Sequence, residues 1–241
     1  MTILNRPTHG LPNIIIPLWK TLRVMGAMSE EQLLGLCEPS SLGSGETQKT
    51  LRTCKNHGIF RLKEKKIELS DKFKKCDLTD PLFRELRSQL LTIILDEKHN
   101  AQVGMKEPEL SGDFTYAASW MCGLDVFSVP GGPWQDDPGI QQLQAEQVSD
   151  VEYFPFGNST RWDGFKDWAS FLGIGWIQIF GSSSYLNIDP TEALKPHLIS
   201  IFGKSKEIPQ HEFIESVSNI LPFLDRGKYQ KLASKQFRTP W

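Results

Sequence analysis

The sequence predicts a mainly α-helical protein, in which three helices and a β-hairpin are followed by a larger helical part. Apolar residues recur at intervals of three and four over most of the chain, which is the helical period. Two short runs near residue 65 alternate at period two, which is typical of strands. Charge is also divided unevenly, with 13 Lys and Arg against 7 Asp and Glu in residues 1–76, but 14 against 22 in residues 77–241. We therefore predict a basic domain over 1–76 and an acidic helical domain over 77–241.

Two helices are predicted before residue 40. Pro12 suits a helix start, and Gly26 suits its end. Apolar residues between them lie on one helical face: Ile15, Leu18, Trp19, Leu22 and Met25. The second helix begins at a capping box, in which Ser29 and Gln32 satisfy each other's backbone N–H groups. Its buried side consists of Leu33, Leu34, Leu36 and Cys37, and Pro39 follows its end.

The third helix is predicted from about Gly45 to Gly58, and a hairpin follows it. Leu51 and Cys54 face inward, and Ile59 completes the apolar seam. The residues expected on the outer side are Gln48, Lys49, Arg52, Thr53 and Lys55. Residues 59–62 and 66–70 form the two strands, which turn through residues 63–65.

This order of elements, with the pattern L-R-x-x-x-x-x-G-I-F-R-L before I-E-L-S-D, resembles the winged helix-turn-helix over residues 11–75. In DNA-binding winged helices the third helix enters the major groove and the hairpin, or wing, touches the backbone or minor groove. The resemblance thus implies contacts to double-stranded DNA from the third helix and the wing. The candidate residues are Gln48, Lys49, Arg52, Thr53, Lys55, Lys63, Lys65 and Lys66. Arg and Gln can read base edges and Lys can neutralise phosphates, whereas Glu46, Glu64 and Glu68 oppose a polyanion.

Helices account for the larger part of the chain as well. Asp80-Pro81 is expected to open a helix that runs to about Leu95, and residues 114–124 form a short buried helix. Residues 158–180 are predicted as one long helix, which Asn158 or Ser159 can cap. It carries a buried aromatic stripe, because Trp162, Phe165, Trp168, Trp176 and Ile179 repeat at three to four. Two further helices are expected after Asp189 and Pro209. They could form a partial second helix-turn-helix unit within residues 189–241.

No catalytic, metal or cofactor site is predicted. The sequence lacks GxxxxGK[ST], GxGxxG, HExxH and GxSxG motifs, and Asp136-Asp137 fits a turn better than a metal site. The five His residues are scattered, and surface or capping roles are expected for them. The cysteines (37, 54, 76 and 122) form no CxxC pair, so reduced structural thiols are expected. With no membrane span and no secretion signal in the sequence, we expect a cytoplasmic protein.

The layout of the whole chain resembles one family. The relevant features are ILNRPTHGLPNIIIPLW at the start, the winged helix, W-A-S-F-L-G-I-G-W, and D-P-T-E-A-L. Together they resemble DpdG-type proteins of bacterial 7-deazaguanine DNA modification and restriction islands, which act in phage defence. Membership implies a non-catalytic accessory protein that works with DNA-acting enzymes and contacts other defence proteins through its acidic domain. Two alternatives are a transcriptional regulator, which should dimerise to read paired half-sites, and a protein-binding assembly module without DNA binding.

Overall fold

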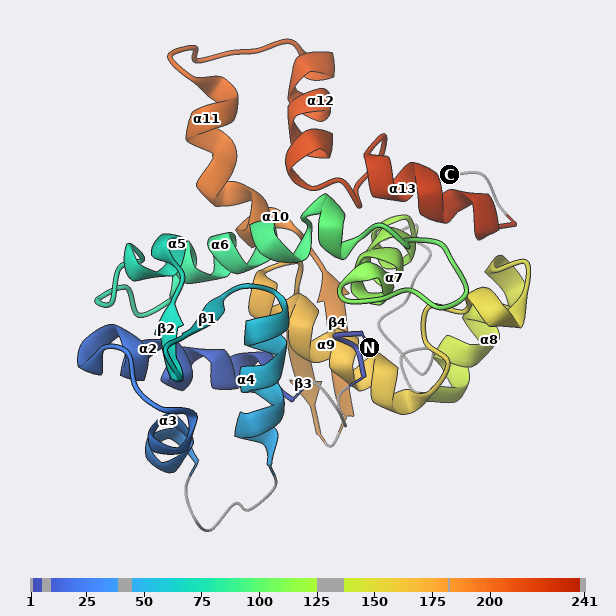
Figure 1. Ribbon diagram of the computed structural model, residues 1–241. Helices are drawn as coiled ribbons and strands as arrows, with labels where there is room; N and C mark the ends of the chain where they lie inside the picture. Colours follow the sequence, from blue (N-terminus) through green and yellow to red (C-terminus); the bar gives the residue numbers. More distant parts are fainter. Residues whose placement is uncertain (1, 6–9, 39–44, 125–136, 182, 239–241) are drawn as a thin grey trace.

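The N-terminal part contains the predicted order of three helices and a hairpin. The computed structural model describes residues 2–5, 10–38, 45–124, 137–181 and 183–238. In the N-terminal part its elements are η1 (Pro12–Ile14), α2 (Ile15–Met25), α3 (Glu30–Cys37), α4 (Glu46–Asn56), β1 (Phe60–Lys63), β2 (Lys66–Leu69) and α5 (Asp71–Lys74). They lie together at one end of the molecule (Figure 1).

The helix signals act as the sequence predicts. Gly26 ends α2 with a φ of 80°, in the left-handed region that glycine tolerates best. At the start of α3 the Ser29 side chain accepts from the Gln32 backbone N–H, and the Gln32 side chain accepts from that of Ser29. Four of the five residues predicted on the buried face of α2 are buried, whereas the fifth, Met25, is exposed. On α3, Leu36 was predicted to be buried and is exposed as well. Both lie near the ends of their helices.

The hairpin turns on two residues. Phe60 pairs with Leu69 and Lys63 pairs with Lys66, so Glu64 and Lys65 form the loop. Both loop residues have positive φ (49° and 64°), as the two central residues of a type I′ turn require. Ile67 also forms an isolated antiparallel bridge with Met28 in the α2–α3 connection, outside the two-stranded sheet. The bridge therefore links the hairpin to the base of the first two helices.

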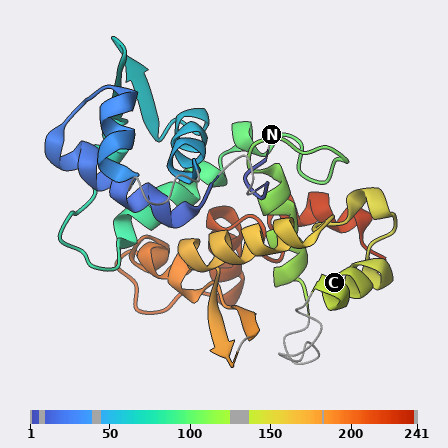
Figure 2. The ribbon, with the colours of Figure 1, turned by 90° about the horizontal axis from the view of Figure 1, so that it is seen from below.

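The larger part surrounds two central helices, α7 and α9. Its elements are α6 (Arg84–Ile94), η2 (Glu97–His99), α7 (Gly112–Cys122), α8 (Asp137–Gln147), η4 (Val151–Tyr153), α9 (Ser159–Leu172), β3 (Gly175–Phe180), β4 (Ser183–Ile188), α10 (Thr191–Leu194), η5 (Lys195–His197), α11 (Leu198–Phe202), α12 (Gln210–Ile220), α13 (Lys228–Ala233) and η6 (Ser234–Gln236). Residues 112–121 of α7 are all buried. Viewed from below, α9 crosses the middle of the molecule (Figure 2).

An aromatic cluster holds α7, α9 and the segment before α9 together. Phe156 lies 5.0 Å from Trp162, 5.3 Å from Phe165 and 5.9 Å from Trp120, measured between ring centroids. All four rings are buried, so the predicted stripe on α9 belongs to the core over this length. The predicted cap is also present, since the Asn158 side chain accepts from the Arg161 backbone N–H at 3.0 Å.

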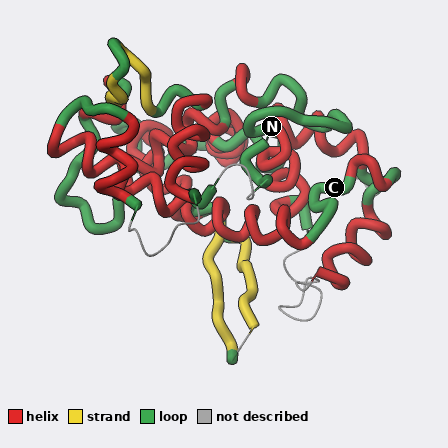
Figure 3. Tube along the Cα trace, turned by 60° about the horizontal axis from the view of Figure 1, so that its bottom comes forward, coloured by secondary structure: helices red, strands yellow, loops and turns green. Residues whose placement is uncertain are grey.

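The prediction of a single helix over 158–180 is wrong beyond Leu172. Gly173 adopts a left-handed φ of 78° and ends α9, and residues 175–180 pair with 183–188 as a hairpin. This hairpin projects away from the helices (Figure 3). Trp176 and Ile179 were expected in the buried stripe but are 51% and 76% exposed. Their spacing of three fits a helix, while the alternating, β-branched run around them favours a strand once the glycine has stopped the helix.

The start of α6 also differs from the prediction. Asp80 accepts hydrogen bonds from the backbone N–H groups of Leu82 (3.0 Å) and Arg84 (2.9 Å), which makes a turn. Phe83 then takes a positive φ of 51°, and the helix begins at Arg84, four residues after Asp80. In this position the Phe83 ring contacts the α2 residue Trp19 edge-on at 6.3 Å. The tertiary contact decides where the helix begins.

The C-terminal helices are shorter and more numerous than expected. The helix predicted after Asp189 is divided into α10, η5 and α11, and α12 follows Pro209 as predicted. In Figure 1, α11 and α12 rise from the rest of the molecule as a pair. Two of the helices, α8 and α13, lie outside the helices that the sequence predicts. No hairpin follows α13 within the described residues, and the partial second helix-turn-helix unit stays a prediction.

One buried core connects the two predicted domains. It runs without interruption from α2 and α4 through α6, α7 and α9 to the residues around Leu221. The indole N–H of Trp19 donates to the Phe73 carbonyl (2.9 Å), and the Leu4 N–H donates to the Asp113 carboxylate on α7 (3.2 Å). The boundary at residue 76 stays a prediction. None of the helices in the described ranges has the length and apolar character needed to cross a bilayer.

Candidate nucleic-acid interface

The outer face of α4 carries the predicted base-facing residues. Gln48 and Arg52 are exposed and lie four residues apart, so they share one helical face. Lys49 and Lys55 are half-exposed beside it. The structure thus presents four of the five predicted α4 residues to solvent.

Thr53 is the exception, because its side chain is only 1% exposed and the prediction that it faces outward is wrong. The buried arc of α4 is wider than the Leu51 and Cys54 stripe suggests, since Thr47 and Thr50 are buried too. On one side the Leu11 backbone N–H donates to the Thr50 hydroxyl at 3.1 Å. At the C-terminal end of the helix lies the buried His57. These threonines belong to the helix packing, which a purely apolar pattern does not reveal.

Both lysines of α4 already form ion pairs with carboxylates. The Lys49 ammonium lies 2.8 Å from the Glu46 carboxylate, and that of Lys55 lies 2.8 Å from the Glu30 carboxylate on α3. Ion pairs this accessible contribute only about 0–1 kcal/mol, so a phosphate could replace either carboxylate at small cost. Arg52 is exposed and is the cation on this face best placed for a new contact.

The hairpin, which we call the wing (residues 60–69), concentrates positive charge at its tip. Lys63, Lys65 and Lys66 are exposed, and within the described residues none of them forms an ion pair. Lys63 and Lys66 are direct cross-strand partners, an arrangement of like charges that destabilises a sheet. An anion between or beside them would relieve that repulsion. At the base of the wing Arg61 pairs with Glu68 across the strands and lies 3.7 Å from Asp71.

The described residues do not assemble a metal site or a reactive thiol. No group of three or more His, Cys, Asp or Glu side chains in the described ranges could hold a metal ion, and Asp136 lies outside them. Burial raises the pKa of the Cys54 thiol strongly and that of Cys122 to about 12. A protonated thiol is a poor nucleophile and a poor ligand, whether it is buried, as in Cys54, or half-buried, as in Cys122.

The buried histidines act as structural links. His57 and His99 lie with their ring centroids 4.9 Å apart. Nδ1 of His57 contacts the Thr53 carbonyl (2.9 Å) and Nδ1 of His99 contacts the Ile93 carbonyl (2.7 Å), so both nitrogens act as donors. The sequence indicates a capping role for His57, and the structure confirms it. The pairing with His99 could not be read from the sequence, because the two residues are distant along the chain.

Comparison with known protein families gives a match over the whole chain. A family model described as DpdG-like matches residues 1–241. The chain belongs to the DpdG-like family. No curated protein and no solved structure matches it. The DpdG-like assignment confirms the resemblance seen over the chain, whereas the winged-helix interpretation of residues 11–75 rests on element order and on the wing geometry and stays a prediction.

Proposed function

We propose that this DpdG-like protein is a non-catalytic, DNA-binding accessory protein of a bacterial 7-deazaguanine DNA modification and restriction system. The observation that carries the proposal is the wing tip, where Lys63, Lys65 and Lys66 are exposed, form no ion pair with any described residue, and include two that oppose each other across the strands. Phosphates supply the affinity of most protein–DNA contacts, and unpaired lysines are suited to them. Gln48 and Arg52 on α4 would read base edges in the major groove.

The acidic part is proposed to bind partner proteins of the same system. Residues 77–241 carry a net charge of −8, which disfavours contact between this part and a DNA backbone. It also exposes large apolar side chains, including Trp176 and Ile179 on the projecting hairpin and Ile199 on α11. This division would place DNA on the N-terminal part and proteins on the remainder. Co-purification with the modification enzymes of the system tests it.

The DNA proposal is tested by the anisotropy of labelled duplex DNA at several salt concentrations. Replacing Lys63, Lys65 and Lys66 by Ala should weaken binding and lower the slope of log K against log salt by about 0.9 for each lost phosphate contact. The control removes the same charge elsewhere, at the exposed Lys204, Lys206 and Lys235. Equal losses in both triple variants, or no salt-dependent binding by the unaltered protein, would overturn the proposal and favour the assembly module. A stable dimer on sizing chromatography would favour the regulator.

A further inference from the structure

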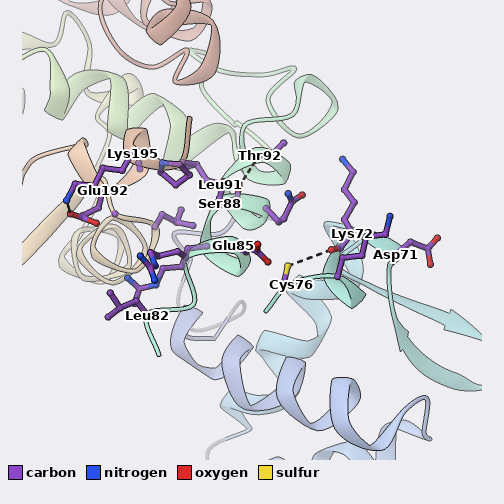
Figure 4. A pocket seen from close by; sticks show the side chains of 18 residues that line it. Asp71, Lys72, Cys76, Leu82, Glu85, Ser88, Leu91, Thr92, Glu192 and Lys195 are labelled. Atoms are coloured by element: carbon purple, nitrogen blue, oxygen red, sulfur yellow. Dashed lines mark hydrogen bonds and ion pairs between the residues drawn. The ribbon is translucent and has the colours of Figure 1, made fainter. Parts of the chain in front are cut away.

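A large groove separates the start of α6 and α5 on one side from α10 on the other. Its volume is about 1310 Å³, above the roughly 300–1,000 Å³ of typical small-ligand pockets. Figure 4 shows Lys72 of α5 at one end of the groove and Glu192 and Lys195 at the other. The size and length favour an extended ligand.

Positive charge is in excess in the groove. Five cationic side chains line it: Lys72, Lys75, Arg84, Arg87 and Lys195. Arg84 pairs with Asp80, and Lys195 pairs with Glu192. Within the described ranges, Lys72, Lys75 and Arg87 have no carboxylate within ion-pair distance.

The three acidic side chains in the lining already have partners. Asp71 lies 3.2 Å from the Lys74 ammonium, and the Glu85 carboxylate accepts from the Asp77 backbone N–H at 2.9 Å. Glu192 is the partner of Lys195. The groove therefore presents cations to a ligand, whereas its carboxylates already form ion pairs or hydrogen bonds within the protein.

Arg87 is the residue that most strongly indicates an anionic ligand. Its guanidinium carbon lies 5.3 Å from the centre of the Phe171 ring, and its Nε is buried without a hydrogen-bond partner. Burial lowers its pKa, although Asp80 and Glu192 act in the opposite direction. A half-buried guanidinium that has no carboxylate within ion-pair distance in the described ranges is costly, and an anion in the groove would offset that cost.

The rest of the groove lining is mixed, with apolar side chains beside the polar Ser88, Gln89 and Thr92. Leu82 is 57% exposed at its rim, and Leu91 and Leu172 lie deeper. Cations beside apolar walls match a chain of nucleotides, whose phosphates need donors and whose bases need flat apolar or guanidinium surfaces. A purely acidic peptide would leave the apolar walls uncovered. Lys72 and Lys75 also follow the wing closely in sequence, because α5 begins at Asp71, with only Ser70 between it and β2.

We propose that this groove binds a single-stranded segment of DNA, with phosphates on Lys72, Lys75 and Arg87 and bases against the exposed Leu82 at its rim. The choice of a nucleotide ligand rests on the proposed DNA function, but the site is separate from the wing and from α4. A duplex on the wing and an unpaired strand in the groove would let the protein hold a junction between the two.

The test measures anisotropy of a labelled oligothymidylate of about eight nucleotides, within the usual 4–16 nucleotide range of single-strand sites. Lys72→Gln with Lys75→Gln, both on exposed side chains, should weaken binding roughly tenfold and lower the salt slope by about 0.7 for each lost contact. Arg87→Met, which keeps the apolar stem over Phe171, should act in the same direction. Lys204→Gln with Lys206→Gln is the charge-matched control.

Competing ligands identify what the groove binds. Binding of duplex DNA, measured in parallel, separates this proposal from the one for the wing. Unlabelled oligothymidylate should displace the probe, whereas thymidine monophosphate and polyglutamate at equal charge should not. Displacement by polyglutamate would assign the groove to an acidic peptide, and equal affinity for the monophosphate would assign it to a free nucleotide; either result overturns the single-strand proposal. Groove variants that bind single strands normally would overturn it as well. The wing variants should lose affinity for duplex DNA but keep their affinity for single strands. If only the expected loss of duplex binding is absent, the result therefore counts against the proposal for the wing and not against the proposal for the groove.

Discussion

Nε2 of His57, at the end of α4, lies 3.0 Å from the hydroxyl oxygen of Ser111, which precedes α7. Because Nδ1 donates to the Thr53 carbonyl, Nε2 of the neutral ring accepts the Ser111 proton. Both residues are buried, so the bond holds the proposed recognition helix against the central helix of the larger part. The orientation of α4 is therefore tied to the rest of the molecule.

Removing this link should destabilise the protein. His57→Ala leaves the Ser111 hydroxyl without its imidazole partner and removes a buried ring, while the Thr53 carbonyl keeps only the backbone N–H of residue 57 (3.0 Å); the cost should be about 2–4 kcal/mol in the free energy of unfolding. Urea unfolding followed by circular dichroism measures the difference. His211→Ala, at an exposed site on α12, should change stability by no more than about 0.5 kcal/mol. A similar small change for His57→Ala would show that the link carries no energy.

Freeing Lys49 should strengthen duplex binding. Glu46→Gln removes a negative charge from the proposed DNA face and releases the ammonium that Glu46 holds at 2.8 Å. We expect affinity to rise roughly two- to fivefold at low salt, with a smaller gain as salt screens the charges. Glu212→Gln, on the exposed surface of α12, makes the same change of charge away from the face. An equal gain in duplex affinity in both variants would mean that the net charge of the protein, and not the position of Glu46, sets the affinity.

Asp113 should make stability depend on pH in a narrow window. Burial raises the pKa of its carboxyl from 3.8 to about 6, although Thr2, Arg161 and two backbone N–H groups act against burial. Its folded pKa exceeds the unfolded value, so its protonation favours the native state fully below about pH 4, and this contribution is lost as the pH rises through 6. The contribution is on the order of 3 kcal/mol.

The comparison of the unaltered protein with Asp113→Asn isolates this effect. Urea unfolding at pH 5 and pH 7.5 should show a larger gain of stability at pH 5 for the unaltered protein than for the variant. Burial lowers the pKa of His197, which opposes the trend, but this residue is common to both proteins and cancels in the difference. Parallel pH profiles would contradict the assignment.

Gly173 should tolerate a methyl group less well than Gly181. Both residues have positive φ, 78° and 61°, so Ala is strained at either position by about 1–2 kcal/mol. A Cβ at Gly173 would also lie 3.0 Å from the Glu192 Cβ and 3.1 Å from the Ala193 N, whereas none of the described atoms approaches one at Gly181 within 4 Å. Gly173→Ala should therefore cost about 1–3 kcal/mol more. Thermal unfolding of the two variants gives the difference directly.

Substitutions of Trp176 and Trp162 should differ strongly in their effect on stability, although the sequence places both residues in one apparent aromatic stripe. Trp162→Ala removes a ring that is 2% exposed and should cost about 3–5 kcal/mol. Trp176→Ala removes a ring that is 51% exposed and should change stability by less than about 1 kcal/mol. Denaturant unfolding of each variant is the measurement. A large loss for Trp176→Ala would favour the original helical interpretation of residues 173–180.

Local signals were read correctly from the sequence. The capping box of Ser29 and Gln32, the end of α2 at Gly26 and the cap at Asn158 each depend on a few neighbouring residues. The type I′ turn at Glu64 and Lys65 carries no glycine, yet the alternation of the flanking runs located the hairpin. On the proposed interface, exposure was predicted correctly for Gln48 and Arg52 but not for Thr53.

By itself, the sequence determined the helical character of the protein, the order of its N-terminal elements and the surplus of cations there, because periodicity and charge are properties of neighbouring residues. Only the tertiary structure decided that Asp80 makes a turn before α6, that Thr53 is buried, and that His57 meets Ser111. It also formed the groove that Lys72 and Arg87 line together with α10. These features join segments far apart in the chain, and their free energy comes from packing and desolvation that no local pattern encodes.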